Sequence, residues 1–227
     1  MNKNLTYRKM VSLLFFIWLS CLTVAGVLEA KAEVKPSLAV LPFFVGDPDE
    51  PGRGVVCPIC GGLFRSGEVM VGSQSILTRL VYQKMETLGT FNLIPTEEVE
   101  DALSRRERKR FEEKLIPNSI ELGKELSADF IVLGFVFRFV ERIGSALGVE
   151  RPASVGFDIH LFRVRDRKMV WNGGFDETQK PLSENLFKIG AFIKGKASWV
   201  RAEELAGLGL DEMLKKLPGP GELVERP

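Results

Sequence analysis

Two cysteines, Cys57 and Cys60, have the residue type and spacing that most clearly permit chemistry in this 227-residue chain. They lie in the segment Cys-Pro-Ile-Cys-Gly-Gly, and such a turn lets two thiolates and nearby backbone amides surround one zinc ion. Structural zinc takes four ligands. The only histidine, His160, follows 100 residues after Cys60. The pair alone therefore supplies half of a site, and a site of four cysteines would need two chains.

The Cys57–Cys60 pair has two other interpretations. In an oxidising compartment, neighbouring cysteines form a local disulfide. A Cys-x-x-Cys pair with a central proline is also typical of thioredoxin-like redox motifs, but those motifs open a helix whose N-terminus lowers the thiol pKa. Here Gly61 and Gly62 follow instead. We favour a structural disulfide or an inert pair over a zinc or redox site, and we predict neither a metal ion nor another cofactor.

No combination of residues in the sequence indicates catalysis. His160 alternates with apolar residues in the stretch 153–164, so we expect it to be hydrogen-bonded or solvent-exposed rather than a catalytic base. The run Arg105–Arg110 holds five basic residues in six, but interleaved glutamates are typical of a solvated helix face. The formal net charge is +1, so there is no basic footprint for nucleic acid. We predict a protein that is not an enzyme and does not bind nucleic acid.

The N-terminus indicates export. A basic region at residues 3–9 precedes an apolar run at 11–27, and Ala30-Lys31-Ala32 then presents small residues to a signal peptidase. This pattern predicts a signal peptide over residues 1–32, cleaved after Ala32. The expected location is the periplasm or cell envelope.

The same segment has two alternative interpretations, each of which would attach the protein to a membrane. An uncleaved anchor is the first alternative, because 17 apolar residues reach the lower limit for a membrane-spanning helix. Lipidation at Cys21 is the second. It is less favoured, because Trp18 stands where lipid-modification motifs usually carry leucine.

The remainder predicts a single α/β domain over residues 33–217 and a flexible tail at 218–227. Its centre is the apolar stretch 128–140, which is typical of a strand buried on both faces. Early strands alternate with helices and late strands join by hairpins, so the sheet should be mixed and partly parallel. We expect further strands at 37–45, 91–94, 153–164 and 169–175, helices at 73–88, 96–116, 118–126, 182–193 and 199–217, and an irregular Cys-bearing insert at 46–72.

Four stretches of the domain, in this order, resemble a family of cell-envelope proteins. They are LAVLPF at 38–43, LTRLVYQKMETLGTFNLIPTEEVEDAL at 77–103, LGKELSADFIVLGFV at 122–136 and FDIHLFRVRDRKMVWNG at 157–173. The family comprises the TolB amino-terminal domain, the curli-secretion lipoprotein CsgG and the LpoB-like lipoprotein activators of penicillin-binding proteins. Its pattern is a strand ending in Pro-Phe, a helix–strand–helix unit with Gly-x-Phe, an Ala-Asp start to the middle strand and a closing hairpin.

The resemblance implies an exported, non-enzymatic interaction module that binds a protein partner in the cell envelope. It leaves membrane association and homo-oligomerisation open. The chain departs from the family pattern at Ser127, where glycine is usual, in the insert 46–72 and in the helical pair 182–217. The alternative function is a periplasmic thiol-redox or zinc-binding protein that uses Cys57 and Cys60.

Overall fold

Strand β6 is the centre of the fold, as the apolar stretch predicts. The computed structural model describes residues 35–46, 54–145, 148–180 and 199–225. The expected signal peptide, Cys21 and the helix expected at 182–193 lie outside these residues. The described elements are β1 (Ser37–Val40), β2 (Phe44–Val45), β3 (Gly54–Val56), β4 (Leu63–Arg65), α2 (Ser73–Leu88), β5 (Asn92–Leu93), α3 (Thr96–Ser104), α4 (Arg108–Glu113), α5 (Leu115–Glu125), β6 (Phe130–Val140), β7 (Ile143–Gly144), β8 (Val149–Arg151), β9 (Ser154–Arg163), β10 (Lys168–Thr178), α7 (Ala202–Leu214) and α8 (Pro220–Glu225).

The main sheet is mixed, which confirms the predicted fold class. Its strand order is β10-β9-β6-β1-β5, and the short β2 also pairs with β6. Strands β5, β1 and β6 run parallel, whereas β6, β9 and β10 form an antiparallel meander. The parallel half uses the early helices as crossovers and the antiparallel half uses hairpins, as the order of elements requires.

Local backbone geometry explains several boundaries. Helix α2 ends at Gly89, whose φ of 64° is readily adopted only by glycine. Ser127 has a φ of 53° after α5, a left-handed conformation that glycine adopts more readily than serine. Asp129 then accepts hydrogen bonds from the backbone N–H and the hydroxyl of Ser37, at 2.8 and 2.9 Å, which align the starts of β6 and β1.

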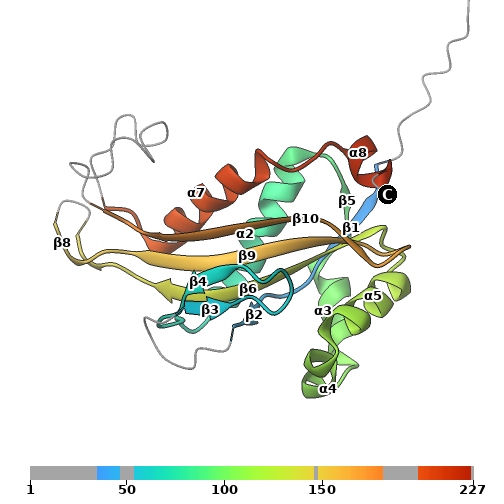
Figure 1. Ribbon diagram of the computed structural model, residues 1–227, viewed down its shortest axis with the longest axis horizontal. Coiled ribbons are helices and arrows are strands. Elements are labelled where there is room, and N and C mark those ends of the chain that lie inside the picture. Colours follow the sequence, from blue (N-terminus) through green and yellow to red (C-terminus); the bar gives the residue numbers. More distant parts are fainter. Residues whose placement is uncertain (1–34, 47–53, 146–147, 181–198, 226–227) are drawn as a thin grey trace, which may run out of the picture. The chain divides into compact units, whose positions relative to one another are not determined.

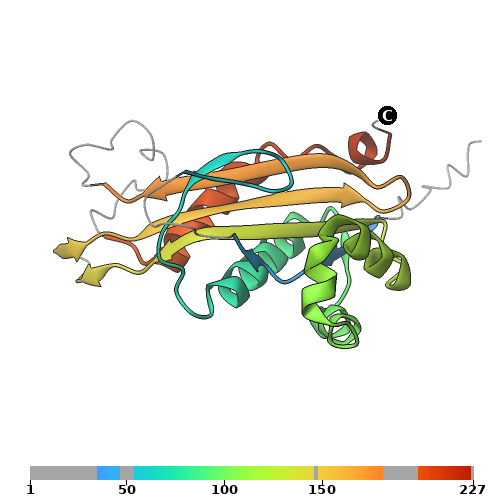
Figure 2. The same cartoon turned by 60° about the horizontal axis from the view of Figure 1, so that its bottom comes forward.

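The two faces of the main sheet have different covers (Figures 1 and 2). Helices α2 and α7 cover the first face, and their apolar residues form one cluster with Val132 of β6 and Phe157 of β9. On the second face, helices α3, α4 and α5 pack on Ile131 and Phe162. The β3–β4 hairpin covers the rest of the second face, where Phe64 stacks on Phe137 with ring centroids 4.5 Å apart.

Three expectations about the elements need correction. The helix expected over 96–116 is two helices, because the chain turns between Ser104 and Arg108. Pro117 does not end a helix but lies in the first turn of α5, where a proline loses no intrahelical hydrogen bond. The tail is helical over Pro220–Glu225, and Leu223 there is fully buried.

The strand β9 also differs from its prediction. We expected it to be half-buried with one polar face, yet all ten of its residues are buried. The residues 46–72, predicted only as an irregular insert, supply the reason, because their β3–β4 hairpin lies over the polar side of β9. Among the described residues, no helix has both the length and the apolar character needed to cross a membrane.

Candidate metal centre

The turn between β3 and β4 presents both cysteines on the inner side of the hairpin. The backbone N–H of Cys57 donates to the carbonyl of Gly62 at 2.8 Å, and the N–H of Gly61 donates to the carbonyl of Cys57 at 3.0 Å. Gly61 has a φ of 73°, which other residues rarely adopt. The glycines after the second cysteine therefore close a tight turn, and they do not begin a helix.

Three backbone amides of this turn point at the sulfur atoms. The N–H groups of Ile59 and Cys60 donate to Sγ of Cys57 at 3.3 and 3.5 Å. The N–H of Gly62 donates to Sγ of Cys60 at 3.4 Å. Hydrogen bonds to a sulfur favour its anionic form, because they place positive dipole ends beside the negative charge.

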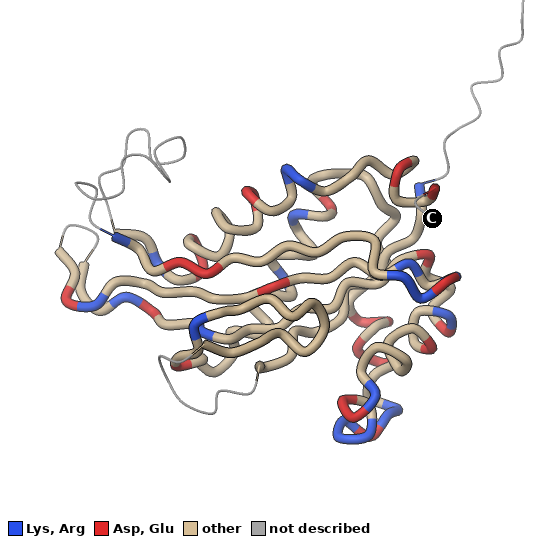
Figure 3. Tube along the Cα trace, viewed as in Figure 1, with Lys and Arg blue, Asp and Glu red and all other residues tan. Residues whose placement is uncertain are grey.

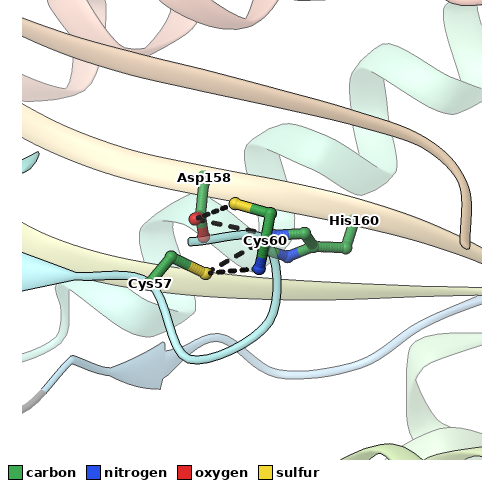
Figure 4. A group of neighbouring side chains, drawn as sticks. All are labelled: Cys57, Cys60, Asp158 and His160. Atoms are coloured by element: carbon green, nitrogen blue, oxygen red, sulfur yellow. Dashed lines mark hydrogen bonds and ion pairs between the residues drawn. The ribbon is translucent and has the colours of Figure 1, made fainter. Parts of the chain in front are cut away.

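Strand β9 supplies two further potential ligands from its hairpin-facing side. Asp158 and His160 are two residues apart, so a strand places their side chains on the same face. Nε2 of His160 lies 3.5 Å from Sγ of Cys57 and 3.5 Å from Oδ2 of Asp158. Sγ of Cys60 lies 3.8 Å from the same Oδ2. One potential ligand atom from each of the four residues lies within 4.8 Å of all the others (Figure 4).

The orientation of the His160 ring is fixed by the central strand. Its Nδ1 lies 3.3 Å from the carbonyl oxygen of Leu133 on β6. A carbonyl only accepts hydrogen bonds, so Nδ1 carries the proton and Nε2 presents a lone pair to the cluster. Histidines that bind metals characteristically donate from the other ring nitrogen in this way.

Burial makes charge unfavourable at this position. Cys57, Asp158 and His160 are each at most 2% exposed. Burial raises the pKa of Cys57 above its ordinary range and raises the pKa of Asp158 to about 6. It lowers the pKa of His160 to about 4, against a smaller opposite effect of the Leu133 carbonyl. No donor among the described residues makes a hydrogen bond to Oδ1 of Asp158, although that oxygen is buried.

This geometry bears on the three interpretations of the Cys57–Cys60 pair, which are a disulfide or inert pair, a zinc site and a redox pair. Both cysteines are free thiols in the structure. Cys57 is buried with a raised pKa and does not begin a helix, and these features oppose a redox nucleophile. Of the two states expected for His160, it is hydrogen-bonded and not solvent-exposed, and it lies beside Cys57 although the two are far apart in the sequence. A zinc site would not require a second chain, because Asp158 and His160 supply two more donors.

Asp158 is the member of the cluster that sequence reasoning missed. The sequence did contain a sign of its role. Asp158 and His160 are polar residues two positions apart, so they share one face of a strand whose other face is apolar. A buried polar pair requires partners. The sequence did not indicate which distant segment would supply them.

The basic run Arg105–Arg110 is a salt-bridged surface, as predicted, although it spans a bend rather than one helix. Arg105 and Arg106 both pair with Glu125 of α5, and Arg110 pairs with Glu107. Basic and acidic segments are interleaved at this corner (Figure 3).

A second buried polar group holds the base of the hairpin. Arg138 of β6 is 6% exposed and forms an ion pair with Asp176 of β10. Its guanidinium also donates to Oγ of Ser154 at 2.6 Å, to the carbonyl of Val155 at 3.2 Å and to the carbonyl of Arg65 at 2.6 Å. One side chain therefore joins the hairpin strand β4 to three strands of the main sheet.

No family model matches the chain, and no curated protein matches it. Several solved structures are similar to it. The lipoprotein GNA1162 from Neisseria meningitidis is 13% identical with a TM-score of 0.44, over 70% of this chain and 96% of that one. The LpoB C-terminal domain from Salmonella enterica is 12% identical with a TM-score of 0.38, over 67% and 90% of the two chains. PelC from Paraburkholderia phytofirmans, a dodecamer, is 13% identical with a TM-score of 0.41, over 83% and 91%. LpoB, which the sequence resemblance names, is thus among the structures to which this chain is similar.

Proposed function

We propose that this chain is an exported, non-enzymatic module of the cell envelope that binds another envelope protein. The signal-peptide pattern at 1–32 and the family-like motifs between residues 38 and 173 support the compartment. The observation that carries the binding role is a groove with a volume of about 660 Å³ between the cysteine turn and the α4–α5 corner.

Six of the twelve residues that line this groove have large apolar side chains. A neighbouring groove of about 390 Å³ lies between α3–α4 and the start of α2, and Phe44 and Arg108 line both grooves. The two hollows therefore adjoin and offer a longer contact surface than either one alone. Apolar residues of the larger groove are Phe44, Val45, Ile59, Leu115, Ile116 and Phe135.

The charges in the lining favour a protein segment over other envelope ligands. The basic Arg108 and Lys114 line the larger groove together with the acidic Glu112 and Glu113. An anionic lipid headgroup or a nucleic acid would require a surface of one sign. A lining that combines apolar side chains with charges of both signs is instead typical of a protein–protein contact, in which both apolar and polar groups meet. The occupant we infer is a segment of another envelope protein that inserts apolar side chains.

Export and contact can be tested separately. A reporter enzyme that is active only outside the cytoplasm, fused after residue 227, should be active when residues 1–32 are present and inactive when they are deleted. A photo-reactive amino acid should then be placed at Ile59 or Leu103, which line the two grooves, and at Leu88 as a control. Leu88 is partly exposed at the opposite end of α2, about 20 Å from the end that lines the smaller groove.

We expect the groove positions to cross-link to one envelope protein in intact cells and Leu88 to give no such adduct. Ile116→Asp should abolish the adduct formed from Ile59, because it places a charge among the apolar side chains that line the groove, whereas Leu88→Asp should leave it intact. Cytoplasmic retention of the reporter would refute the export part. Equal cross-linking at Leu88, or none at the groove, would refute the groove as the contact surface.

A further inference from the structure

We propose that Cys57, Cys60, Asp158 and His160 bind one Zn²⁺ ion, and that this ion fastens the β3–β4 hairpin to strand β9. The proposal rests on the positions of these four side chains and not on the partner-binding role proposed above. It deepens the alternative that the cysteine spacing left open, because it adds two ligands and gives the ion a structural task.

Three of the six distances between the potential ligand atoms match the edges of a zinc tetrahedron, and the other three are at most 4.8 Å. With Zn–S bonds of about 2.3 Å and Zn–N or Zn–O bonds of about 2.1 Å, a tetrahedral site has S–N and S–O edges of roughly 3.6 Å and an N–O edge of roughly 3.4 Å. The corresponding distances here are 3.5 Å for Cys57–His160, 3.8 Å for Cys60–Asp158 and 3.5 Å for His160–Asp158. The remaining pairs, at most 4.8 Å apart, need to approach to roughly 3.6–3.8 Å when the ion binds.

Two features of the surroundings are those that a zinc site needs beyond its ligands. The three amides that donate to Sγ of Cys57 and Cys60 would offset the negative charge of two thiolates. The Leu133 carbonyl holds His160 in the tautomer whose Nε2 lone pair faces the cluster. On binding, Zn²⁺ replaces the two thiol protons, which leave to solvent, while Asp158 binds as a carboxylate and His160 as a neutral imidazole.

The donor set selects the metal. Two sulfurs and an imidazole suit zinc, whereas calcium and magnesium need a shell of oxygens that a single carboxylate cannot supply. Four protein ligands complete a tetrahedron and leave no position for water or substrate, which is typical of structural zinc sites and not of catalytic ones. The site therefore agrees with a protein that is not an enzyme.

The location of the cluster indicates what the ion would do. The hairpin has a small apolar inner side, where Phe64 packs on Phe137, and its tip, the cysteine turn, lies beside Asp158 and His160 of β9. A metal at the tip would join two segments that are about 100 residues apart in the chain. Binding energy at such a site contributes directly to folding.

The deciding experiment is metal analysis of the wild-type protein purified from the cell envelope without chelators. We expect one zinc per chain by elemental mass spectrometry. After zinc removal under reducing conditions, added Co²⁺ should produce a sulfur-to-cobalt charge-transfer band and the intense visible bands of tetrahedral cobalt. Because this measurement uses the native sequence, it does not depend on whether a ligand variant folds.

Variants then identify the ligands. Cys57→Ser, Cys60→Ser, Asp158→Asn and His160→Gln should each weaken zinc binding at least about tenfold. Phe64→Ala is the matched control, because it loosens the same hairpin without removing a ligand, and it should retain one zinc per chain. Complete loss of zinc from Phe64→Ala would mean that the ligand variants act through the hairpin, and the assignment would fail.

A disulfide between Cys57 and Cys60 would give the opposite results in the metal analysis and in the cobalt experiment. A native mass two hydrogens below that of the reduced chain, with no metal and no cobalt spectrum after reduction, would overturn the proposal. It would show that Cys57 and Cys60 form a local disulfide beside His160. Zinc bound through fewer than four of these residues would also overturn the assignment, because a variant of the uninvolved residue would keep wild-type affinity.

Discussion

The two faces of the main sheet are held to the elements that cover them by different interactions. On the α2–α7 face, 24 buried apolar residues of the described chain form a single cluster. On the hairpin side of the other face, the comparable cluster has four residues, and two polar groups lie beside it, the Cys57–His160 cluster and the Arg138 ion pair. Apolar burial tolerates small displacements, whereas hydrogen bonds and metal bonds require donors at fixed distances. The stability of the hairpin face should therefore depend on single polar groups. The stability of the helix face should depend on the volume of its buried apolar side chains.

The largest loss of stability should come from a substitution that removes buried side-chain volume on the α2–α7 face. Leu77 of α2 is fully buried in the large cluster. We expect Leu77→Ala to lower the free energy of unfolding by about 2–5 kcal/mol, through lost burial and a residual cavity. Urea unfolding followed by circular dichroism measures this cost, which should be the same with and without a zinc chelator. A cost that disappears in the chelator would remove the distinction between the two faces.

On the hairpin face, the comparable change removes a charge. Arg138→Met keeps much of the side-chain volume but removes the buried guanidinium from the Arg65 carbonyl and from Asp176, which keeps only its contacts with the exposed Arg65 among the described residues. We expect a cost of about 3 kcal/mol, because unpairing one member of a buried ion pair is strongly destabilising. The same unfolding measurement applies, and the double variant with Asp176→Asn should cost less than the two single changes together. Strict additivity would contradict the ion pair.

A smaller effect is expected from adding volume to the helix face. A Cβ on Gly134 of β6 would lie 2.4 Å from the nearest ring carbon of Phe43. Gly134→Ala should therefore cost about 1–3 kcal/mol through overpacking. Gly207 of α7 is the control, since nothing lies within 4 Å of its added Cβ, and Gly207→Ala should stabilise the helix by about 0.5–1 kcal/mol. Equal effects of the two substitutions in thermal unfolding would show that Phe43 moves aside freely.

The smallest effect should be found on the outer side of the hairpin. Leu63 and Phe64 are adjacent in β4, but Leu63 is 72% exposed and Phe64 is 7% exposed. We expect Leu63→Ser to change the free energy of unfolding by no more than about 0.5 kcal/mol, because it removes little buried area. A larger loss in urea unfolding would show that the outer side of the hairpin is covered in solution.

The sequence predicted those parts of the fold that local patterns determine. Helix α2 spans Ser73–Leu88, as its apolar spacing and the glycine after it predict. The mixed sheet followed from the order of elements. The bend between α3 and α4 was missed, because the apolar spacing continues through the basic run to Phe111, which is buried in spite of the break.

The candidate metal centre was only half predictable for a physical reason. The two cysteines are neighbours in sequence, so their spacing alone indicates a turn that could bind an ion. Asp158 and His160 come into reach only because the hairpin folds over β9, and such a contact between distant segments leaves no periodic signal. The polar side of β9 indicated that something must face it, but it did not identify the hairpin.

The hairpin is attached to the sheet at two points, and this has a consequence for ligand affinity. Arg138 holds the carbonyl of Arg65 at the base of β4, while the cysteine turn lies at the other end of the strand. An anchored base keeps Cys57 and Cys60 at a high effective concentration relative to Asp158 and His160. Loss of the Arg138 anchor would let the turn explore more conformations before it closes. A residue that touches no ligand would thereby set how tightly the four ligands retain an ion, and how long the ion remains bound.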